Sequence, residues 1–212
     1  MIRVLVVDDH GIVRAGICRL LEAEPDVEVA GETGSGHEAI EMCREVQPDV
    51  VLLDFGLPDI DGLEVTRQIV QLGLGTKIVV LTMYASEEYA FRLLRAGASG
   101  FLIKGAPAEE MLLALRKVTR EGRYVTPSIV DKLVGRIGQP SGDAPESALS
   151  DREIQVLVRL ASGLTTKEVA DALNLSPSTV ETYRGRVLDK LNLRNNTELT
   201  RFAIRRGLID LT

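Results

Sequence analysis

Short apolar runs alternate with longer amphipathic segments over the first 124 residues of the chain. The runs predict strands near residues 2–7, 27–31, 49–54, 77–81 and 99–103. Helical periodicity follows each run, near residues 12–23, 36–47, 62–72, 86–96 and 107–120. Runs with so few polar interruptions are typical of strands buried on both faces of a sheet. The pattern therefore predicts an α/β domain with five parallel strands in a doubly wound, flavodoxin-like arrangement.

Polar residues stand at or just after the carboxyl ends of four of the predicted strands. They are Asp8, Asp9, Asp54, Thr82 and Lys104. Ligands of open parallel sheets bind beyond these ends, so we expect the five side chains to converge on one pocket. Clustered acids favour a divalent cation, and a lysine beside them can neutralise phosphoryl oxygens. Singly, each acid could be a helix cap or a turn residue; the set predicts phosphoryl chemistry.

The second half of the chain is helical in pattern. Two capping boxes begin at Ser150 and Thr165, and Ser176 followed by Pro177 marks a third helix start. The connection before Ser176 is short, as in a helix-turn-helix whose second helix enters the major groove. That helix would follow Ser176, with a buried stripe formed by Val180, Val187, Leu188 and Leu191. We expect a final helix at about 196–206, with Leu199, Phe202 and Ala203 on one face.

Composition divides the chain at a segment rich in Gly, Pro and Ser, residues 135–147, which is typical of a linker. We expect a first domain at 1–124, a linker with a short helical extension at 125–148, and an all-α domain of four helices at 149–212. Residues 1–124 carry 13 Lys and Arg against 20 Asp and Glu, a net charge of −7, whereas residues 149–212 carry 10 against 8, or +2. The basic residues of the second half could form a solvated charged face or could contact nucleic acid.

The chain lacks an apolar stretch of about 18 residues and an amino-terminal secretory pattern, so we expect no membrane association and a cytoplasmic location. Cys18 and Cys43 lie within helical patterns without metal-like spacing, which favours free buried thiols. His10 and His37 have no partner ligands at a useful spacing, so neither is expected at a metal site.

The pocket motifs of the first half together resemble the receiver domain of bacterial two-component response regulators. The motifs are Asp8-Asp9-His10, Asp54 followed by Leu57-Pro58 and Asp61-Gly62, Thr82, and Phe101-Leu102-Ile103-Lys104. The resemblance implies that Asp54 accepts a phosphoryl group from a sensor histidine kinase. It implies a Mg²⁺ site formed by Asp8, Asp9, Asp54 and the backbone carbonyl of Gly56. Thr82 and Lys104 would contact the phosphoryl group.

Two positions depart from what is commoner in this family. Phe101 stands at the aromatic switch position, where the family often has tyrosine, so the resemblance leaves the readout of the switch open. Leu57 stands where methionine is commoner, and that exchange conserves volume.

The second half resembles the four-helix output domain of the LuxR type. The motifs are the segments 149–157, 163–170 and 175–184, followed by Lys190-Leu191. A receiver followed by this domain is the arrangement of the NarL/FixJ subfamily. The resemblance implies that Glu181, Thr182 and Gly185 face base edges, and that Lys167, Arg184, Arg186 and Lys190 are available for phosphates.

Glu181 stands where many relatives have lysine. Its carboxylate could accept from cytosine N4, or it could order Arg184 or a neighbouring arginine. In this family the last helix also forms a dimer contact, although Leu199 and Phe202 could simply close the core.

These resemblances imply a transcriptional regulator, not an enzyme, that binds double-stranded promoter DNA as a homodimer when Asp54 is phosphorylated. One alternative is a DNA-binding regulator that a protein partner controls independently of phosphorylation. A phosphatase with an aspartyl nucleophile needs a second carboxylate two residues after the first, where this chain has Gly56. An RNA-binding output lacks stacking aromatic residues in the basic segment.

Overall fold

The computed structural model describes residues 1–82, 87–126, 130, 149–173, 175–206, 208 and 209. Two compact units are present. Of the described residues, 1–82, 89–126 and 130 belong to the first, and those from 149 onward belong to the second. The predicted linker at 125–148 lies outside the described residues except for Val125, Thr126 and Val130.

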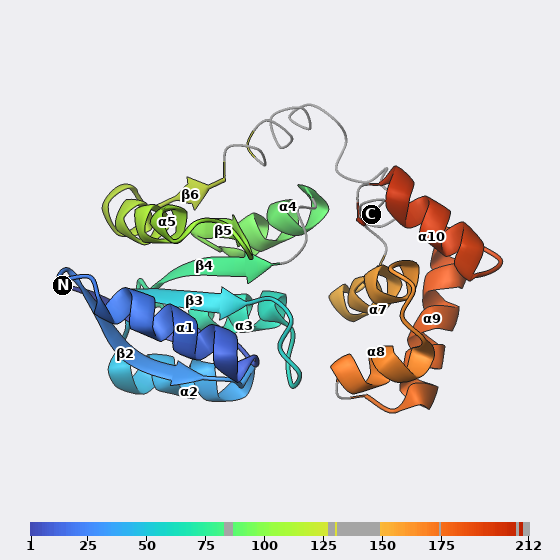
Figure 1. The fold of residues 1–212 in the computed structure, drawn as a ribbon, viewed down its shortest axis with the longest axis horizontal. Coiled ribbons are helices and arrows are strands. Elements are labelled where there is room, and N and C mark those ends of the chain that lie inside the picture. Colours follow the sequence, from blue (N-terminus) through green and yellow to red (C-terminus); the bar gives the residue numbers. More distant parts are fainter. Residues whose placement is uncertain (83–86, 127–129, 131–148, 174, 207, 210–212) are drawn as a thin grey trace. The chain divides into compact units, whose positions relative to one another are not determined.

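The first unit is built on a six-stranded sheet in which every neighbouring pair is parallel (Figure 1). The strands are β1 (Ile2–Val7), β2 (Val27–Thr33), β3 (Val50–Asp54), β4 (Lys77–Thr82), β5 (Gly100–Ile103) and β6 (Tyr124–Val125). Their order across the sheet is β2-β1-β3-β4-β5-β6. The parallel, doubly wound architecture is thus confirmed.

The predicted number of five strands is wrong, because β6 adds a sixth strand at one edge. The amide of Tyr124 donates to the carbonyl of Ser99 over 2.9 Å, and Val125 pairs with Phe101. Two residues cannot produce the apolar run by which the other strands are recognised. The strand exists because the chain leaving the preceding helix meets an unpaired edge of β5.

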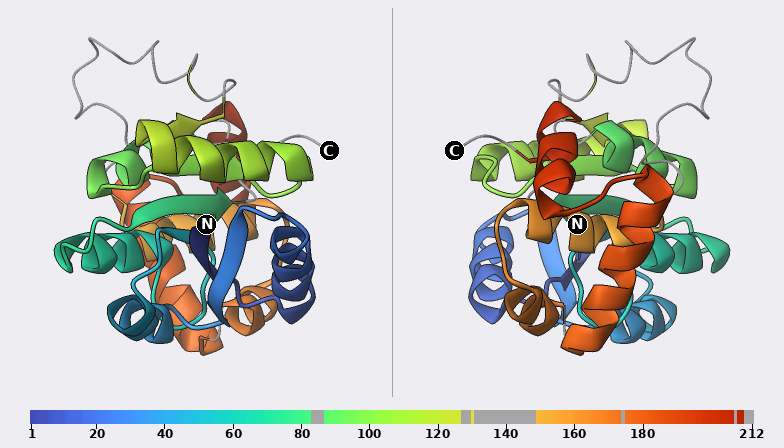
Figure 2. Two further views of the ribbon diagram at one scale, coloured as in Figure 1. Left: turned by 90° about the vertical axis from the view of Figure 1, so that its left-hand side faces the viewer. Right: turned by 90° about the vertical axis from the view of Figure 1, so that its right-hand side faces the viewer.

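In the described part of the first unit, five helices flank the sheet (Figure 2). They are α1 (Gly11–Glu22), α2 (Gly36–Val46), α3 (Gly62–Gln71), α4 (Glu87–Ala96) and α5 (Ala108–Glu121). Leu21 of α1 and Met111, Leu115 and Val118 of α5 pack in one core cluster with alternate residues of the strands. The helices α2 and α3 contact each other on the opposite face. A sheet covered on both faces explains why its strands are apolar throughout.

The second unit consists of α7 (Asp151–Ala161), α8 (Thr166–Ala172), α9 (Pro177–Leu191) and α10 (Asn196–Arg205). Both predicted capping boxes form, at Ser150 with Glu153 and at Thr165 with Glu168. The predicted stripe of α9 is buried, as are Leu199 and Ala203 of α10, whereas Phe202 is half-buried. Among the helices that the structure describes, none is long and apolar enough to cross a membrane.

Candidate functional site

The predicted pocket residues meet at the carboxyl end of the sheet. Asp8 follows β1, Asp54 closes β3, Thr82 closes β4 and Lys104 follows β5. Asp8 is 0% exposed and Asp54 is 4% exposed, and Thr82 is also buried. The Lys104 ammonium joins the two acids, because its Nζ lies 2.9 Å from Asp8 Oδ2 and 2.7 Å from Asp54 Oδ2. Residues almost a hundred positions apart therefore form one ionic cluster.

Burial and charge oppose each other in this cluster. Burial raises the pKa of Asp54, while the Lys104 ammonium and a hydrogen bond from the Gly56 amide, 3.2 Å from Oδ1, lower it in part. Burial alone would lower the pKa of Lys104, but attraction by the Asp54 and Asp8 carboxylates outweighs it and raises that pKa above its ordinary value of 10.5. The lysine is therefore a fixed positive charge beside a carboxylate.

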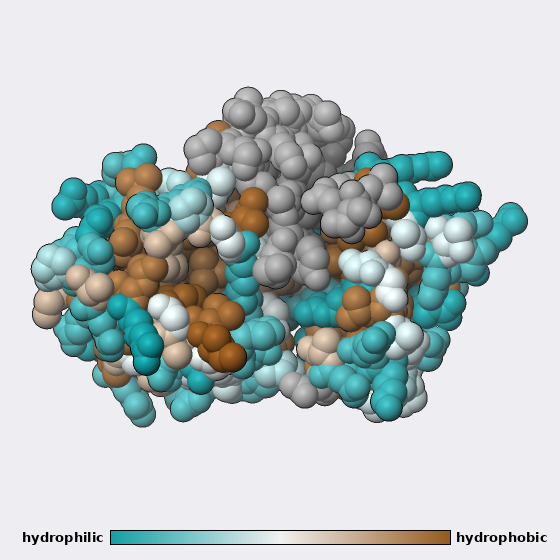
Figure 3. Space-filling model, in the orientation of Figure 1, coloured by the Kyte–Doolittle hydropathy of each residue, from teal (hydrophilic) through white to brown (hydrophobic). Residues whose placement is uncertain are grey.

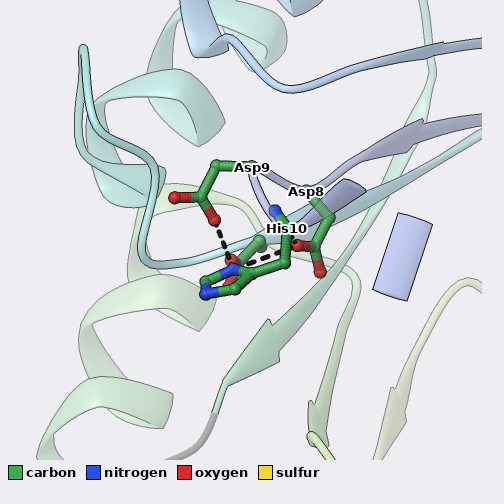
Figure 4. A group of neighbouring side chains, drawn as sticks. Asp8, Asp9 and His10 are labelled. Carbon is green, nitrogen blue, oxygen red and sulfur yellow. Dashed lines mark hydrogen bonds and ion pairs between the residues drawn. The ribbon is translucent and has the colours of Figure 1, made fainter. Parts of the chain in front are cut away.

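His10, which the sequence spacing did not place near a metal site, lies beside the acids in the structure. Asp8, Asp9, His10 and Asp54 each offer one ligand atom, and the four atoms lie within 4.8 Å of one another. His10 Nδ1 lies 2.6 Å from Asp9 Oδ1 and 3.5 Å from Asp8 Oδ1 (Figure 4). His10 is the N-cap residue of α1, and its amide donates to Asp8 Oδ1 over 2.8 Å. Spacing rules for separated ligands do not detect a residue that directly follows the acids.

The donor set is compatible with a divalent cation. Within the described part of the chain, Asp8 Oδ2 and Asp9 Oδ1 are buried without a hydrogen bond of good geometry, although each has an ion-pair neighbour. Carboxylate oxygens are the ligands that Mg²⁺ prefers. Arg14 Nη1 donates to the Asp8 carbonyl over 2.6 Å and so holds this strand end in place. Buried oxygens that still have capacity to accept are those that a hard cation would use.

Phe101, the predicted switch residue, is completely buried in β5 between Val80 and Val125 of the neighbouring strands. Its carbonyl accepts from the amide and the hydroxyl of Thr126, over 3.4 and 3.3 Å. The backbone of Phe101 is therefore bonded to the segment through which the chain leaves the sheet.

The exposed part of α9 carries the predicted DNA-contacting residues. Glu181, Thr182 and Arg186 are exposed, as is Lys167 of α8, while Arg184 and Gly185 are half-buried. Glu181 accepts from the Thr166 hydroxyl over 2.7 Å and from Arg184 Nη1 over 3.2 Å. Arg184 Nε donates to Asn196 Oδ1 over 2.6 Å. Glu181 and Asn196 thus hold the Arg184 guanidinium between them.

Lys190, also expected to contact phosphates, has an intramolecular partner. Its Nζ lies 2.7 Å from Oε2 of Glu153, a residue only 2% exposed. The same carboxylate oxygen accepts from the Ser150 amide in the capping box of α7. Lys190 therefore ties the end of α9 to the start of α7. The sequence predicted that Glu153 caps α7. It did not predict that Glu153 pairs with Lys190, because 37 residues separate the two.

The fold and the two sites define a receiver joined to a helical DNA-binding domain. Residues 4–116 match the family model of the response regulator receiver domain, and residues 147–203 match that of the bacterial regulatory proteins of the luxR family. The chain belongs to the two-component response regulators and carries a LuxR-type DNA-binding domain.

The relatives of this chain match it over almost its whole length. The response regulator GacA of Pseudomonas protegens is 44% identical over 210 residues, covering 99% of both chains. The response regulator UvrY of Escherichia coli (strain K12) is 41% identical over 209 residues, covering 98% of this chain and 96% of UvrY. A solved complex of the response regulator RcsB with DNA matches with a TM-score of 0.59 at 26% identity, covering 95% of this chain and 96% of that one.

Proposed function

We propose that Asp54 is the phosphoacceptor and that its phosphorylation controls DNA binding by the second unit. The observation that carries the proposal is the buried Asp54 carboxylate, held 2.7 Å from the Lys104 ammonium within a cluster of acids. A carboxylate with a fixed counter-charge can approach a phosphoryl anion that bare acids would repel. This assignment sets the remaining roles in the pocket.

In the proposed reaction, an oxygen of Asp54 attacks the phosphorus of a phosphohistidine on a sensor histidine kinase. The new P–O bond forms as the P–N bond breaks, and the released imidazole nitrogen keeps the electron pair and takes a proton from solvent water. Lys104 neutralises the transferred phosphoryl oxygens, and the Thr82 hydroxyl contacts them. A bound Mg²⁺ would supply further charge neutralisation; Asp8, Asp9, Asp54 and the Gly56 carbonyl would hold it.

The kinase would dock beside α1. Ile12 is 92% exposed and Val13 is partly exposed at the start of this helix. An apolar groove of about 420 Å³ continues between α1 and α5, lined by Val13, Ile17, Gly105 and Met111, and Lys104 lies in its wall. Figure 3 shows apolar surface over these elements. A partner that delivers a phosphoryl group to Asp54 must cover the pocket mouth, and this surface offers it apolar contact.

For the output, we propose that α9 enters the major groove of double-stranded promoter DNA. Thr182 and Gly185 would face base edges, with Lys167, Arg184 and Arg186 on phosphates. Glu181 would order Arg184 rather than read cytosine, because both of its oxygens already accept hydrogen bonds within the protein. Lys190 would contribute through its pairing with Glu153.

Each copy offers few cations to DNA, so we propose a homodimer that pairs two weak sites, with α10 in the contact. Phosphorylation would shift Thr82 and Phe101 and thereby favour pairing. The domain limits proposed for this switch are 1–124 and 149–212, joined by 125–148. A protein that binds chromosomal DNA in this way would work in the cytoplasm.

The test is the intact mass of the chain after incubation with acetyl phosphate and Mg²⁺. We expect a phosphoryl adduct on the wild type and on Asp26→Asn, a matched change at the opposite end of the sheet, and none on Asp54→Asn. Binding of promoter DNA should then increase in the phosphorylated wild type and in phosphorylated Asp26→Asn, but not in Asp54→Asn. A folded, Mg²⁺-bound wild type without an adduct would contradict the proposal and favour control by a protein partner.

A further inference from the structure

We propose that Asp59 is a positioning residue for the cation site, because it fixes the loop that carries Gly56 against the start of α2. This inference rests on the proposed function only in taking the Gly56 carbonyl as a ligand. Asp59 lies in the connection between β3 and α3, five residues after Asp54 and between the Leu57-Pro58 and Asp61-Gly62 motifs.

The carboxylate of Asp59 accepts three hydrogen bonds from one short segment. The Ser35 hydroxyl donates to Oδ2 over 2.7 Å, the Gly36 amide to Oδ1 over 3.0 Å and the His37 amide to Oδ2 over 3.1 Å. The two amides belong to the first turn of α2, where backbone donors lack partners within the helix. These contacts lower the pKa of Asp59 to about 2 against the opposing effect of burial, so it stays ionised at neutral pH.

The side chains around these hydrogen bonds are tightly packed. A Cβ at Gly36 would lie 2.4 Å from Cγ2 of Ile60 and 2.7 Å from Cγ2 of Val65, so α2 and the loop approach to a distance that only glycine permits. The ends of the loop are held separately. The Gly56 amide donates to Asp54, and Asp61 caps α3 through the amides of Leu63 and Glu64. Asp59 supplies the hydrogen bonds described above between the middle of the loop and α2, beside the packing of Ile60.

The same segment continues to the other side of the cation site. The Ser35 amide donates to Thr33 Oγ1 over 3.1 Å, and the Asp8 amide donates to the Thr33 carbonyl over 3.0 Å. Asp59 therefore connects the loop of Gly56, through the start of α2 and the end of β2, to the strand end that bears Asp8 and Asp9. Its contacts set the separation between the two groups of oxygen ligands.

Asparagine at position 59 would keep the size of the side chain but not its acceptors. One of the two oxygens becomes an NH₂ group facing donors, and the charge that favours the start of α2 is lost. The loop would then move relative to α2, and the Gly56 carbonyl would move with it. Partners that orient metal ligands typically change metal affinity by about 10- to 100-fold when removed.

The experiment is a calorimetric titration of full-length protein with Mg²⁺, comparing wild type, Asp59→Asn and Asp59→Glu. We expect Asp59→Asn to weaken Mg²⁺ binding about tenfold, and Asp59→Glu, which keeps the charge, to lose less. The matched control is Asp26→Asn, which removes another well-bonded carboxylate, the partner of Arg116. We expect its Mg²⁺ affinity to equal that of the wild type.

A second readout separates positioning from general weakening of the fold. In acetyl phosphate labelling, the Mg²⁺ concentration for half-maximal rate should rise in Asp59→Asn in proportion to the calorimetric change, while the rate at saturating Mg²⁺ stays within about twofold. Because calorimetry needs no phosphoryl transfer, failure of the proposed function and failure of this inference give different results.

Two outcomes would overturn the inference. One is a folded Asp59→Asn protein that binds Mg²⁺ as tightly as the wild type. The other is an equal loss of affinity in Asp59→Asn and Asp26→Asn. Should Asp59→Asn not fold, Ser35→Ala removes one of the three donors, and unchanged Mg²⁺ affinity in that folded variant would equally overturn it.

Discussion

The pocket of the receiver and the exposed face of α9 are both rich in charge, but they compensate it differently. Asp8, Asp54 and Thr82 are buried, and Lys104 is the counter-charge of both acids. Glu181 and Arg184 are partly exposed, so water solvates and screens their charges in addition to their pairing with each other. Exposed pairs typically contribute less than about 1 kcal/mol, whereas removing one member of a buried pair costs several. The first site is therefore fixed by the fold, and the second can rearrange around DNA.

This difference suits the two tasks. Phosphoryl transfer needs groups that are in place before the donor arrives, since movement during the reaction adds to the barrier. Recognition of DNA needs cations that can exchange one anionic partner for another. Arg184 now donates to Asn196 and Glu181, and both contacts can be given up to a phosphate at small cost.

The largest effect expected from a change to one side of this comparison is that of Lys104→Met. It leaves the Asp8 and Asp54 carboxylates buried together without their counter-charge, so we expect the free energy of unfolding to fall by about 2–4 kcal/mol in EDTA. Urea unfolding measures this, and added Mg²⁺ should restore part of the loss. Lys117→Met, on α5 outside the pocket, is the matched control and should change stability by less than about 1 kcal/mol. Equal stability of the two variants would contradict the picture of a preformed ionic cluster.

Lys190→Met should show that Lys190, although it lies on α9, stabilises a buried acid as Lys104 does in the pocket. We expect a loss of about 1–2 kcal/mol in urea unfolding, because buried Glu153 loses a partner, with no change in the salt dependence of DNA binding. Lys167→Met is the control with the opposite expectation, since it should keep its stability and reduce the salt slope by about one. A reduced salt slope in Lys190→Met would instead assign Lys190 to a phosphate.

The stability difference should also depend on pH. Burial raises the pKa of Glu153, but the bonds from Lys190 and Ser150 outweigh it and lower that pKa below its ordinary value of 4.5. A carboxyl group whose pKa is lowered by folding stabilises the fold above its unfolded pKa and loses this contribution as the pH falls through the folded pKa. The gap between the wild type and Lys190→Met should thus be full at pH 6 and above and narrow below about pH 4.5.

The smallest expected effect is that of Glu181→Ala. If Glu181 only orders Arg184, binding to all DNA sequences should change by a common factor of about threefold or less. If Glu181 reads a base, preference at one position of the half-site should fall by about 1–3 kcal/mol. Competition binding with single-base variants of the half-site separates the two. Thr182→Ala provides a comparison at a neighbouring exposed position.

The sequence predicted the elements whose signals lie within a short stretch of the chain. Long apolar strands, the caps at Ser150, Thr165 and Ser176, and the stripe of α9 all depend on neighbours within a few residues, and all were found. The polar set at the strand ends followed from a topological rule, since parallel strands present their carboxyl ends at one edge. That rule correctly predicted that Asp8, Asp54 and Lys104 lie close together.

What the sequence did not predict depends on contacts between distant segments. β6 is a strand only because β5 has a free edge, and Lys190 pairs with a residue 37 positions away. In the sequence Asp59 resembles an ordinary turn residue, because its hydrogen-bond partners at the start of α2 are distant along the chain. The position of the His10 ring beside Asp9 is likewise not predictable from spacing, because it depends on side-chain conformations at the strand end.

The outer strands of the sheet also bear on how such a protein survives at high local concentration. An unpaired strand edge can recruit the edge of another molecule and start aggregation. Here β6 ends the sheet after two residues, too few to act as a template. At the opposite edge, β2 carries exposed glutamates at positions 28 and 32, and its register with β1 shifts between Val4 and Leu5. Two copies of the chain brought close together, as in the proposed homodimer, would thereby be kept from joining their sheets into one.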